Sequence, residues 1–418
     1  MREEERNLNP MDYLVVDLLE EIFLRLPCKS ILKLKTISKQ WRSILESRRF
    51  MERRVDFQAK VKILAVRDDR TESGFEGDEE IEMVYLHCDD DATRPLITFE
   101  GLVCIPEPGW INVLNPTTRQ LQRFPCTPDH PVSDVNLRRT PYLTFFSGNW
   151  AMGFGRDKVT DRYKVVRMCF GHVEECEILD LETGEWRKLN PPPHKVDEGR
   201  KSVCINGGSI YWLHIQRVYK VLALDLHKEE YRKVPVPATS ITLDTQIVNL
   251  EDRLVLAITR VRPEWILEIW GMDRDKERWS KSYSISLDPS RVVSWRRQKR
   301  WFTPVAVSKQ GNLVFYDNKN RRQDYYPRTD VIRCLSLNTC VMSPYMENLV
   351  PLPLKPSHPL PARRNSDLEM RMSRCRLFST PGSWISKVLK KNVWILDILF
   401  TSLVVVGYIC LPLWELFI

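Results

Sequence analysis

The stretch Ile178-Leu-Asp-Leu-Glu-Thr-Gly-Glu-Trp186 is one copy of a weak internal repeat. Its unit is an apolar strand, an acidic or Asn turn, and then an aromatic or apolar residue that opens a basic strand. Further copies are Val113-Leu-Asn-Pro-Thr-Thr-Arg-Gln-Leu121, Ala223-Leu-Asp-Leu-His-Lys-Glu-Glu-Tyr231, Trp270-Gly-Met-Asp-Arg-Asp-Lys-Glu-Arg-Trp279 and Phe315-Tyr-Asp-Asn-Lys-Asn320. Asp225 precedes Asp273 by 48 residues, and Asp273 precedes Asp317 by 44. A period of about 45 residues is typical of a four-stranded propeller blade.

The region around these copies, residues 60–353, predicts an all-β domain. Short runs rich in Val, Ile, Tyr and Trp alternate there with turn clusters, as at 164–168 and 209–213. Some 290 residues at about 45 per blade predict a β-propeller-like domain of six or seven blades. Trp186 and Trp279 should then occupy equivalent places, about one to three blades apart.

Residues 11–56 predict a small helical domain of three helices, preceded by a charged, disordered tail at 1–10. Apolar residues recur at spacings of three and four, which places them on one helix face: Leu18, Leu19, Ile22, Phe23 and Leu26. Asp17 and Glu20 resemble a capping box, and Pro27 closes the helix. Ser30 and Ser38 can cap the second and third helices. So small a unit buries little apolar surface and should need a partner.

The composition excludes a wholly disordered, collagen-like or multi-spanning chain, because 43% of the 418 residues are hydrophobic and 10% are aromatic. The net charge of +8 is concentrated locally. Residues 363–391 hold eight basic residues and two acidic ones, so this segment alone carries +6. No nucleic-acid partner is expected. The basic and aromatic stretch 295–301 is interpreted as a loop between blades, with a nucleic-acid or import patch as the alternative.

No residue has the pattern of a catalytic, cofactor-binding or metal-binding group, so the chain is not expected to be an enzyme or to need a cofactor. Gly153-Phe-Gly155 lacks the third glycine of a phosphate loop and is predicted to be a β-turn. His172 and Cys176 have no second ligand pair at zinc spacing. An enzyme using the propeller channel would need a His and a carboxylate to converge there.

The C-terminal part predicts a basic linker at 354–392 and a transmembrane tail anchor at 393–418. Ile398–Ile418 holds one charge, Glu415, and as a helix would span roughly 31 Å, the thickness of a bilayer core. Lys387, Lys390 and Lys391 flank only its N-terminal side, which predicts that the helical and β domains face the cytosol. A last propeller strand or a buried helix is the alternative; without insertion the chain would be cytoplasmic or nuclear.

The helical region closely resembles an F-box. The motif is Leu14-Val-Val-Asp-Leu-Leu-Glu-Glu-Ile-Phe-Leu-Arg-Leu-Pro-Cys-Lys-Ser30 followed by Ile37-Ser-Lys-Gln-Trp-Arg-Ser43. Val15 stands where the family usually has proline. The resemblance implies docking on a Skp-type adaptor that joins a cullin scaffold. The residues expected at the adaptor are Leu14, Leu18, Ile22, Leu26, Pro27, Leu34 and Trp41. Some of them, Trp41 and Ile22 especially, could instead only pack the helices together.

The β region resembles the kelch-related F-box-associated domain of plant proteins. The motifs are Phe99-Glu-Gly-Leu-Val-Cys104, Val113-Leu-Asn-Pro-Thr-Thr-Arg119, Thr160-Asp-Arg-Tyr-Lys-Val-Val166 and Ile205-Asn-Gly-Gly-Ser-Ile-Tyr-Trp212. The combined resemblance implies a non-catalytic substrate-recognition subunit of an SCF-type E3 ubiquitin ligase, which holds an unidentified protein substrate for ubiquitination. The alternative is an adaptor-independent protein-binding scaffold at a membrane surface.

Overall fold

The structure is a computed structural model of the chain. It describes residues 16–57, 61–68, 81–88, 97–107, 110–125, 150–170, 174–196, 201–205, 208–214, 220–237, 241, 244–260, 265–273, 277–287, 302–317, 322–327, 331–336, 339–350, 352 and 377–379.

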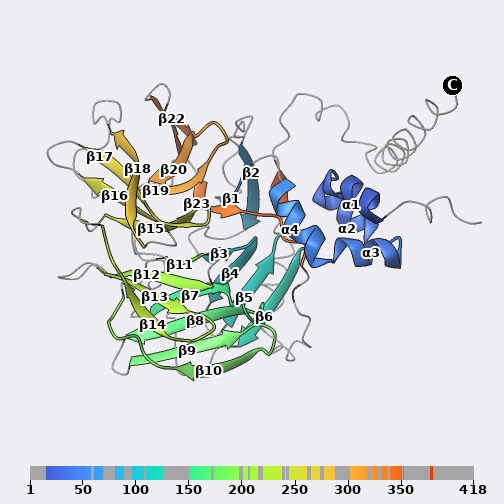
Figure 1. The fold of residues 1–418 in the computed structure, drawn as a ribbon, viewed down its shortest axis with the longest axis horizontal. Coiled ribbons are helices and arrows are strands. Elements are labelled where there is room, and N and C mark those ends of the chain that lie inside the picture. The colour runs from blue at the N-terminus through green and yellow to red at the C-terminus, as the bar shows by residue number, and fades with distance from the viewer. Residues whose placement is uncertain are drawn as a thin grey trace, which may run out of the picture. The chain divides into compact units, whose positions relative to one another are not determined.

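The helical region contains four helices and not the predicted three (Figure 1). They are α1 (Val16–Leu24), α2 (Cys28–Leu34), α3 (Lys39–Leu45) and α4 (Arg48–Phe57). Ser38 is the N-cap residue of α3 as predicted, although its side chain makes no capping hydrogen bond. Ser30 does not cap α2, because the helix begins at Cys28 with Pro27 as its N-cap residue.

The four helices share one apolar core. Leu19 and Phe23 of α1, Ile31 of α2, Leu45 of α3 and Phe50 of α4 are all buried in it. The fourth helix therefore belongs to the domain and is not an extension of the linker that follows it.

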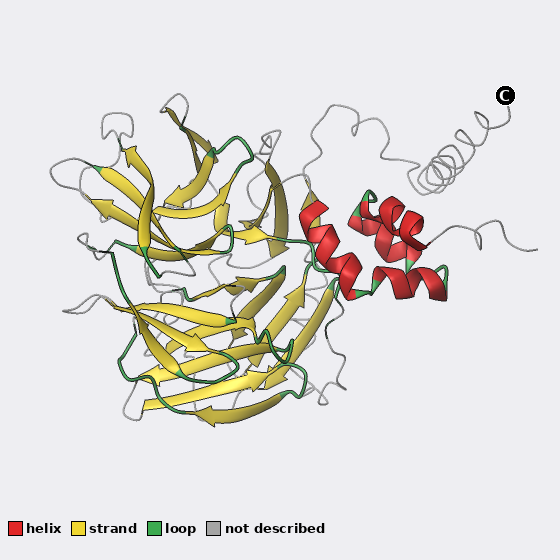
Figure 2. Ribbon diagram, viewed as in Figure 1, coloured by secondary structure: helices red, strands yellow, loops and turns green. Residues whose placement is uncertain are grey.

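The β region forms six four-stranded sheets in the part of the chain that the structure describes (Figure 2). Five of them are antiparallel sheets whose strands follow one another in the chain: β3 (Ile97–Phe99), β4 (Leu102–Glu107), β5 (Trp110–Asn115) and β6 (Gln120–Pro125); β7 (Trp150–Arg156), β8 (Tyr163–Phe170), β9 (Glu174–Asp180) and β10 (Glu185–Leu189); β11 (Val203–Ile205), β12 (Ser209–His214), β13 (Lys220–Asp225) and β14 (Tyr231–Val234); β15 (Gln246–Leu250), β16 (Arg253–Arg260), β17 (Ile266–Met272) and β18 (Trp279–Ser286); β19 (Phe302–Val307), β20 (Leu313–Asp317), β21 (Arg322–Tyr326) and β22 (Val331–Ser336).

The sixth sheet joins the two ends of the β region. Its order is β23 (Thr339–Tyr345), β1 (Val61–Asp68), β2 (Ile81–Cys88) and β24 (Leu377–Ser379). β1 pairs antiparallel with β23 and parallel with β2. Around the axis, β3, β7, β11, β15, β19 and β23 each contact the next, and β23 contacts β3. This closed ring of six sheets is a propeller in which early and late strands share one blade, which closes the ring.

The internal repeat corresponds to a recurring turn between the third and fourth strands of a blade. The side-chain oxygen of Asn115 accepts hydrogen bonds from the backbone N–H groups two and three residues later, and so do Asp180 and Asp225. Four residues after the Asn or Asp, the backbone is left-handed, at Arg119, Gly184 and Glu229. The acidic or Asn position therefore recurs because its side chain closes the turn.

The prediction of a β-turn at Gly153–Gly155 is wrong, because both glycines lie within strand β7. A Cβ atom on Gly153 would come within 2.6 Å of the Trp212 ring, and one on Gly155 would come within 2.4 Å of Cys204 Sγ. Trp212 and Cys204 belong to the next blade, so the glycines allow two neighbouring blades to approach closely.

The predicted transmembrane anchor and the membrane localisation drawn from it are wrong. No helix in the described part of the chain is both long and apolar enough to cross a bilayer. Its longest helix, α4, has 10 residues and carries several charges, whereas a span needs about 20 apolar residues. The segment 393–418 itself lies outside the described residues.

Candidate functional site

Helix α1 has two apolar faces. Leu19 and Phe23 point into the helical core, where both are buried. Leu18 and Ile22 lie one turn apart on the neighbouring face, about 100° further around the helix, with exposed fractions of 55% and 37%. The recurring apolar residues that predicted one face thus divide between a core face and a solvent face. The solvent face is the surface expected to bury itself against another protein.

The other predicted contact residues lie around this face to different degrees. Pro27 is exposed, while Leu26 and Leu34 are half-buried against the helical core. Trp41 is half-buried, and its ring packs edge to face against Phe23 with centroids 5.4 Å apart. Trp41 therefore helps to hold the helices together, which leaves only part of its ring for a partner. Leu14 and the unusual Val15 lie outside the described residues.

Sequence reasoning missed three exposed apolar side chains of the described helical residues: Val16 at the start of α1, Ile37 and Phe57. Ile37 precedes α3 and is 66% exposed, more than any other apolar side chain of the described helical residues. Phe57 ends α4 and is also exposed, with the Arg25 guanidinium 5.6 Å from its ring centroid. Ile37 is part of the quoted F-box motif but was not among the residues expected at the adaptor. Its position in the turn between α2 and α3 could be recognised only from the actual helix boundaries.

Charged contacts fix α1 against α4. The buried carboxylate of Glu20 accepts a hydrogen bond of 2.8 Å from Arg53 and lies 3.5 Å from Arg49 Nε. Arg53 also pairs with Glu21. Arg54, buried, donates to the carbonyl oxygen of Leu24 at 3.0 Å. These contacts fix the orientation of α1 against α4, and with it the direction of its exposed apolar face.

The segment that follows β23 packs directly against the helices. Leu349 is buried within the helical core. Lys35 Nζ donates to the Leu349 carbonyl oxygen at 3.2 Å. Asn348 donates to the Glu100 carbonyl oxygen, at 2.8 Å, in the β3–β4 turn. Residues of the helical core and of a propeller blade are therefore held by one short stretch of chain.

Glu347 is the charged centre of that stretch. Its carboxylate accepts hydrogen bonds from Cys28 Sγ at 2.8 Å and from Lys62 Nζ at 2.7 Å, and it lies 3.6 Å from Arg54. Burial alone would raise the pKa of Glu347, but Lys62, Cys28 and Arg54 hold this pKa below its usual value. Burial, with Glu347 adding to it, raises the pKa of Cys28 to about 12. Cys28 is therefore an uncharged hydrogen-bond donor and not a reactive thiolate.

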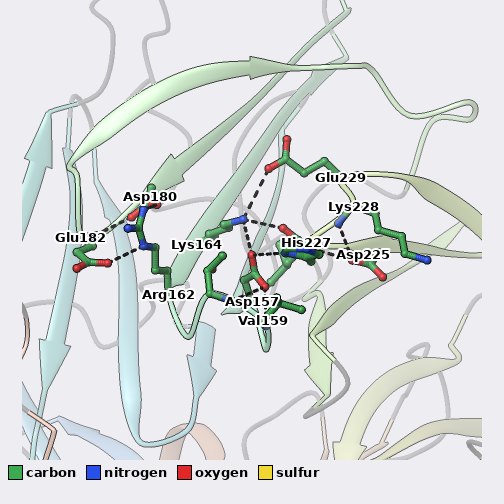
Figure 3. Close-up of polar contacts among 12 residues, drawn as sticks. Asp157, Val159, Arg162, Lys164, Asp180, Glu182, Asp225, His227, Lys228 and Glu229 are labelled. Carbon is green, nitrogen blue, oxygen red and sulfur yellow. Dashed lines mark hydrogen bonds and ion pairs between the residues drawn. The ribbon is translucent and has the colours of Figure 1, made fainter.

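A second buried charge cluster joins the blade of β7–β10 to the blade of β11–β14 (Figure 3). Lys164 Nζ lies 2.9 Å from Asp157 Oδ2 and donates to the Leu226 carbonyl oxygen at 2.7 Å. His227 Nδ1 lies 3.4 Å from the same Asp157 oxygen. Burial would raise the pKa of Asp157, but the hydrogen bonds from Lys164 and from the turn hold it well below its usual value. Because each group is committed to a partner, the cluster has the character of a structural joint between blades.

A cavity of about 500 Å³ lies along the propeller axis. Its walls come from the innermost strands or adjoining turns of five sheets, and include Phe99, Ser202, Ile247, Val305 and Tyr345. Within the described residues, no group of three or more His, Cys, Asp or Glu side chains could hold a metal ion. The cavity wall combines polar and apolar side chains.

These features define a four-helix domain with an exposed apolar face, linked to a six-bladed propeller with an axial cavity. Residues 11–53 match the F-box domain, and residues 69–327 match the F-box associated beta propeller domain. The chain belongs to the family of plant F-box proteins with an F-box-associated domain.

Two relatives from Arabidopsis thaliana align over nearly the whole chain. An F-box/LRR-repeat protein is 66% identical over 430 residues, covering 99% of this chain and 100% of the relative. An F-box/kelch-repeat protein is 58% identical over 430 residues, with the same coverage. Among solved structures, a protein of unknown function from Bacteroides thetaiotaomicron aligns with a TM-score of 0.34 at 8% identity, over 66% of this chain and 62% of that one.

Proposed function

We propose that the chain is the substrate-recognition subunit of an SCF-type E3 ubiquitin ligase. The helical domain would dock on a Skp-type adaptor that joins a cullin scaffold, and the propeller would hold the protein to be ubiquitinated. The chain itself would do no chemistry. Its contribution would be to raise the local concentration of the substrate at the ligase.

The exposure of Leu18 and Ile22 is the observation that carries this proposal. Leu19 and Phe23 already fill the core, so the outward pair adds nothing to the packing of the isolated domain. Burial of the exposed parts of these two side chains at an interface would stabilise a complex by about 1 kcal/mol each. Leu14, Leu26, Pro27, Leu34 and Trp41 remain proposed neighbours of this contact.

The contacts between the helical region and the propeller are consistent with the same role. A receptor must present its substrate at a defined place relative to the adaptor, and Glu347 contacts both Cys28 of the helical region and Lys62 of the propeller. These contacts favour a joint that transmits position from one part to the other.

Co-purification with a Skp-type adaptor tests the proposal. The full chain with Leu18→Asp and Ile22→Asp should lose the adaptor, because two charges would be placed in a desolvated apolar contact. Val159→Asp is the matched control, since Val159 is an exposed apolar residue in a propeller turn. The control should retain the adaptor.

Circular dichroism and the thermal midpoint establish whether each variant is folded. If the double variant is folded and still co-purifies with the adaptor as the wild-type chain does, the docking proposal is wrong. A wild-type chain that binds no adaptor would contradict the proposed function as a whole.

A further inference from the structure

Three basic side chains project from one face of the blade of β11–β14. His214 is paired directly with Lys220 across β12 and β13, and Lys233 of β14 is paired with the residue two positions after Lys220. Paired residues lie on the same face of a sheet, as do alternate residues of one strand. The partner of Lys233, Leu222, is buried in the apolar core shared with the blade of β7–β10. The three basic groups therefore face the blade of β7–β10.

His194 approaches the same face from the segment that follows β10. The next residue, Lys195, fixes this segment by lying over the Phe170 ring of β8, 5.7 Å from its centroid. Burial and the nearby positive charges of Lys220 and Lys233 lower the pKa of His194, with a further contribution from the third group of the blade face. The four groups thus form one basic cluster, which consists of His194, His214, Lys220 and Lys233.

The basic cluster contains hydrogen-bonding atoms and charges without partners. His194 Nε2 and His214 Nδ1 are buried, and neither has a hydrogen-bond partner among the described residues. In the same part of the chain, no carboxylate is paired with Lys220 or Lys233. Like charges on adjoining strands are destabilising, and buried polar groups without partners are rare in native proteins. An anion bound within the cluster would relieve both costs.

A phosphoryl group has the chemistry that the basic cluster requires. It carries about two negative charges at neutral pH and has three strong acceptor oxygens. Two ammonium groups balance that charge, and an imidazole nitrogen that carries a proton donates to a remaining oxygen. A carboxylate carries a single charge and would balance only one of the two lysines.

The basic cluster lies at the rim of the propeller where β10 and β14 end and β13 begins. The helical region is joined to the opposite rim. There the Asn348 amide, beyond the end of β23, contacts the Glu100 carbonyl oxygen, and Glu100 in turn pairs with Arg156 at the end of β7. A ligand at the basic cluster would therefore lie away from the adaptor-binding face.

We propose that the basic cluster binds a phosphoryl dianion, which is held by Lys220 and Lys233 and oriented by His194 and His214. The test of this site does not depend on the proposed function. Phosphoryl groups occur in free phosphate compounds and on phosphorylated protein side chains, so two sources of the same ligand chemistry must be distinguished.

Calorimetric titration of the full chain with inorganic phosphate, at constant ionic strength, measures the site. The wild-type chain should bind one phosphate. Lys220→Gln and Lys233→Gln should each weaken this binding about tenfold, because each removes a charge-assisted hydrogen bond. Lys188→Gln is the matched control and should keep the full affinity. Lys188 is an exposed lysine of β10, on the other face of the strand from Leu189, which packs in the core between the blades.

The thermal midpoint separates a ligand-binding role from a structural one. Without phosphate, the double variant with Lys220→Gln and Lys233→Gln should have an unchanged or raised midpoint, because it removes two like charges that lie close together. Phosphate should raise the midpoint of the wild-type chain and of Lys188→Gln, but not that of the double variant.

A short peptide with one phosphoserine, compared with the same peptide carrying serine, identifies the source of the ligand. Tighter binding of the phosphopeptide than of inorganic phosphate would support the site and assign it to phosphorylated proteins. Binding of inorganic phosphate alone would support the site and assign it to free phosphate compounds.

The proposal is overturned if the folded wild-type chain shows no saturable phosphate binding, or if the folded double variant binds phosphate as tightly as the wild type. An equal loss of affinity in Lys188→Gln and Lys220→Gln would also overturn it, because binding would then follow the net charge and not the position of the lysines.

Discussion

The indole Nε1 of Trp186 donates a hydrogen bond to the carbonyl oxygen of Pro125, at 2.8 Å. Trp186 lies in the outermost strand of one blade, and Pro125 ends the outermost strand of the blade before it. Two blades further on, Trp279 Nε1 makes the same bond to Pro235, at 2.7 Å. This repetition confirms the prediction that the two tryptophans occupy equivalent places, and it ties outer strands together across blade junctions.

Replacement of either tryptophan by phenylalanine should therefore destabilise the propeller. Trp186→Phe and Trp279→Phe each remove one hydrogen bond while keeping a ring, and each should lower the free energy of unfolding by about 1 kcal/mol. The bonds lie at separate junctions, so the double variant should lose the sum. Urea denaturation measures all three changes; no loss in either single variant would show that the bond contributes nothing.

The left-handed turn positions predict changes of opposite sign. Arg119 is exposed with a φ of 60°, so Arg119→Gly should relieve backbone strain and raise the free energy of unfolding by about 0.5–1 kcal/mol. Gly184 has a φ of 69°, so Gly184→Ala should lower the free energy of unfolding by about 1 kcal/mol. Arg119→Ala separates strain from loss of the side chain, since alanine keeps the strain. Thermal denaturation measures both variants. If Arg119→Gly and Arg119→Ala change the stability equally, backbone strain at Arg119 is not the explanation.

The Asp157–Lys164 pair predicts strong coupling between two substitutions. Asp157→Asn leaves the Lys164 ammonium buried without its main counter-charge. Lys164→Met likewise leaves the Asp157 carboxylate buried without its main counter-charge. Each should destabilise the chain by about 3 kcal/mol or more, whereas the double variant should lose less than the sum. Denaturant titrations of the four proteins form the cycle. Additive losses would mean that the two groups do not act as a pair.

Glu347 predicts a loss of stability in acid. Because its folded pKa lies below its usual value, the ionised carboxylate contributes stability that is fully present above about pH 5 and is lost as the pH falls through that folded pKa. Glu347→Gln should be less stable than wild type by about 1–2 kcal/mol at pH 7, and the difference should shrink toward pH 3. Exposed Glu185 provides the control, as Glu185→Gln should have little effect at any pH. A pH-independent difference for Glu347→Gln would contradict the ionic role.

The propeller was predictable from the sequence because several blades repeat the same turn between their third and fourth strands. The Asn or Asp side chain closes its turn within three residues, so the pattern survives although the strand sequences differ. The closure of the ring was not predictable, since β1 pairs with β23 across nearly the whole domain. The number of blades, left at six or seven, depends on that pairing.

The helical site was predictable only in part. Spacing placed Leu18 and Ile22 on a helix, but it could not separate them from Leu19 and Phe23, whose burial depends on α3 and α4. Helix α4 was missed because its sequence is mostly charged, and contacts such as Arg53–Glu20 and Arg54–Leu24 join it to residues about 30 positions away. The C-terminal anchor was predicted from hydropathy, length and flanking residues, which are local criteria that take no account of the rest of the structure.

The affinity of the full chain for a purified Skp-type adaptor, measured by calorimetry across single alanine variants, tests the central proposal most directly. Leu18→Ala and Ile22→Ala should each weaken binding about tenfold without lowering the thermal midpoint, because their side chains face solvent in the free chain. Trp41→Ala should lower both affinity and thermal midpoint, since its ring packs on Phe23. Unchanged affinities for both Leu18→Ala and Ile22→Ala would show that the exposed face of α1 is not the docking surface.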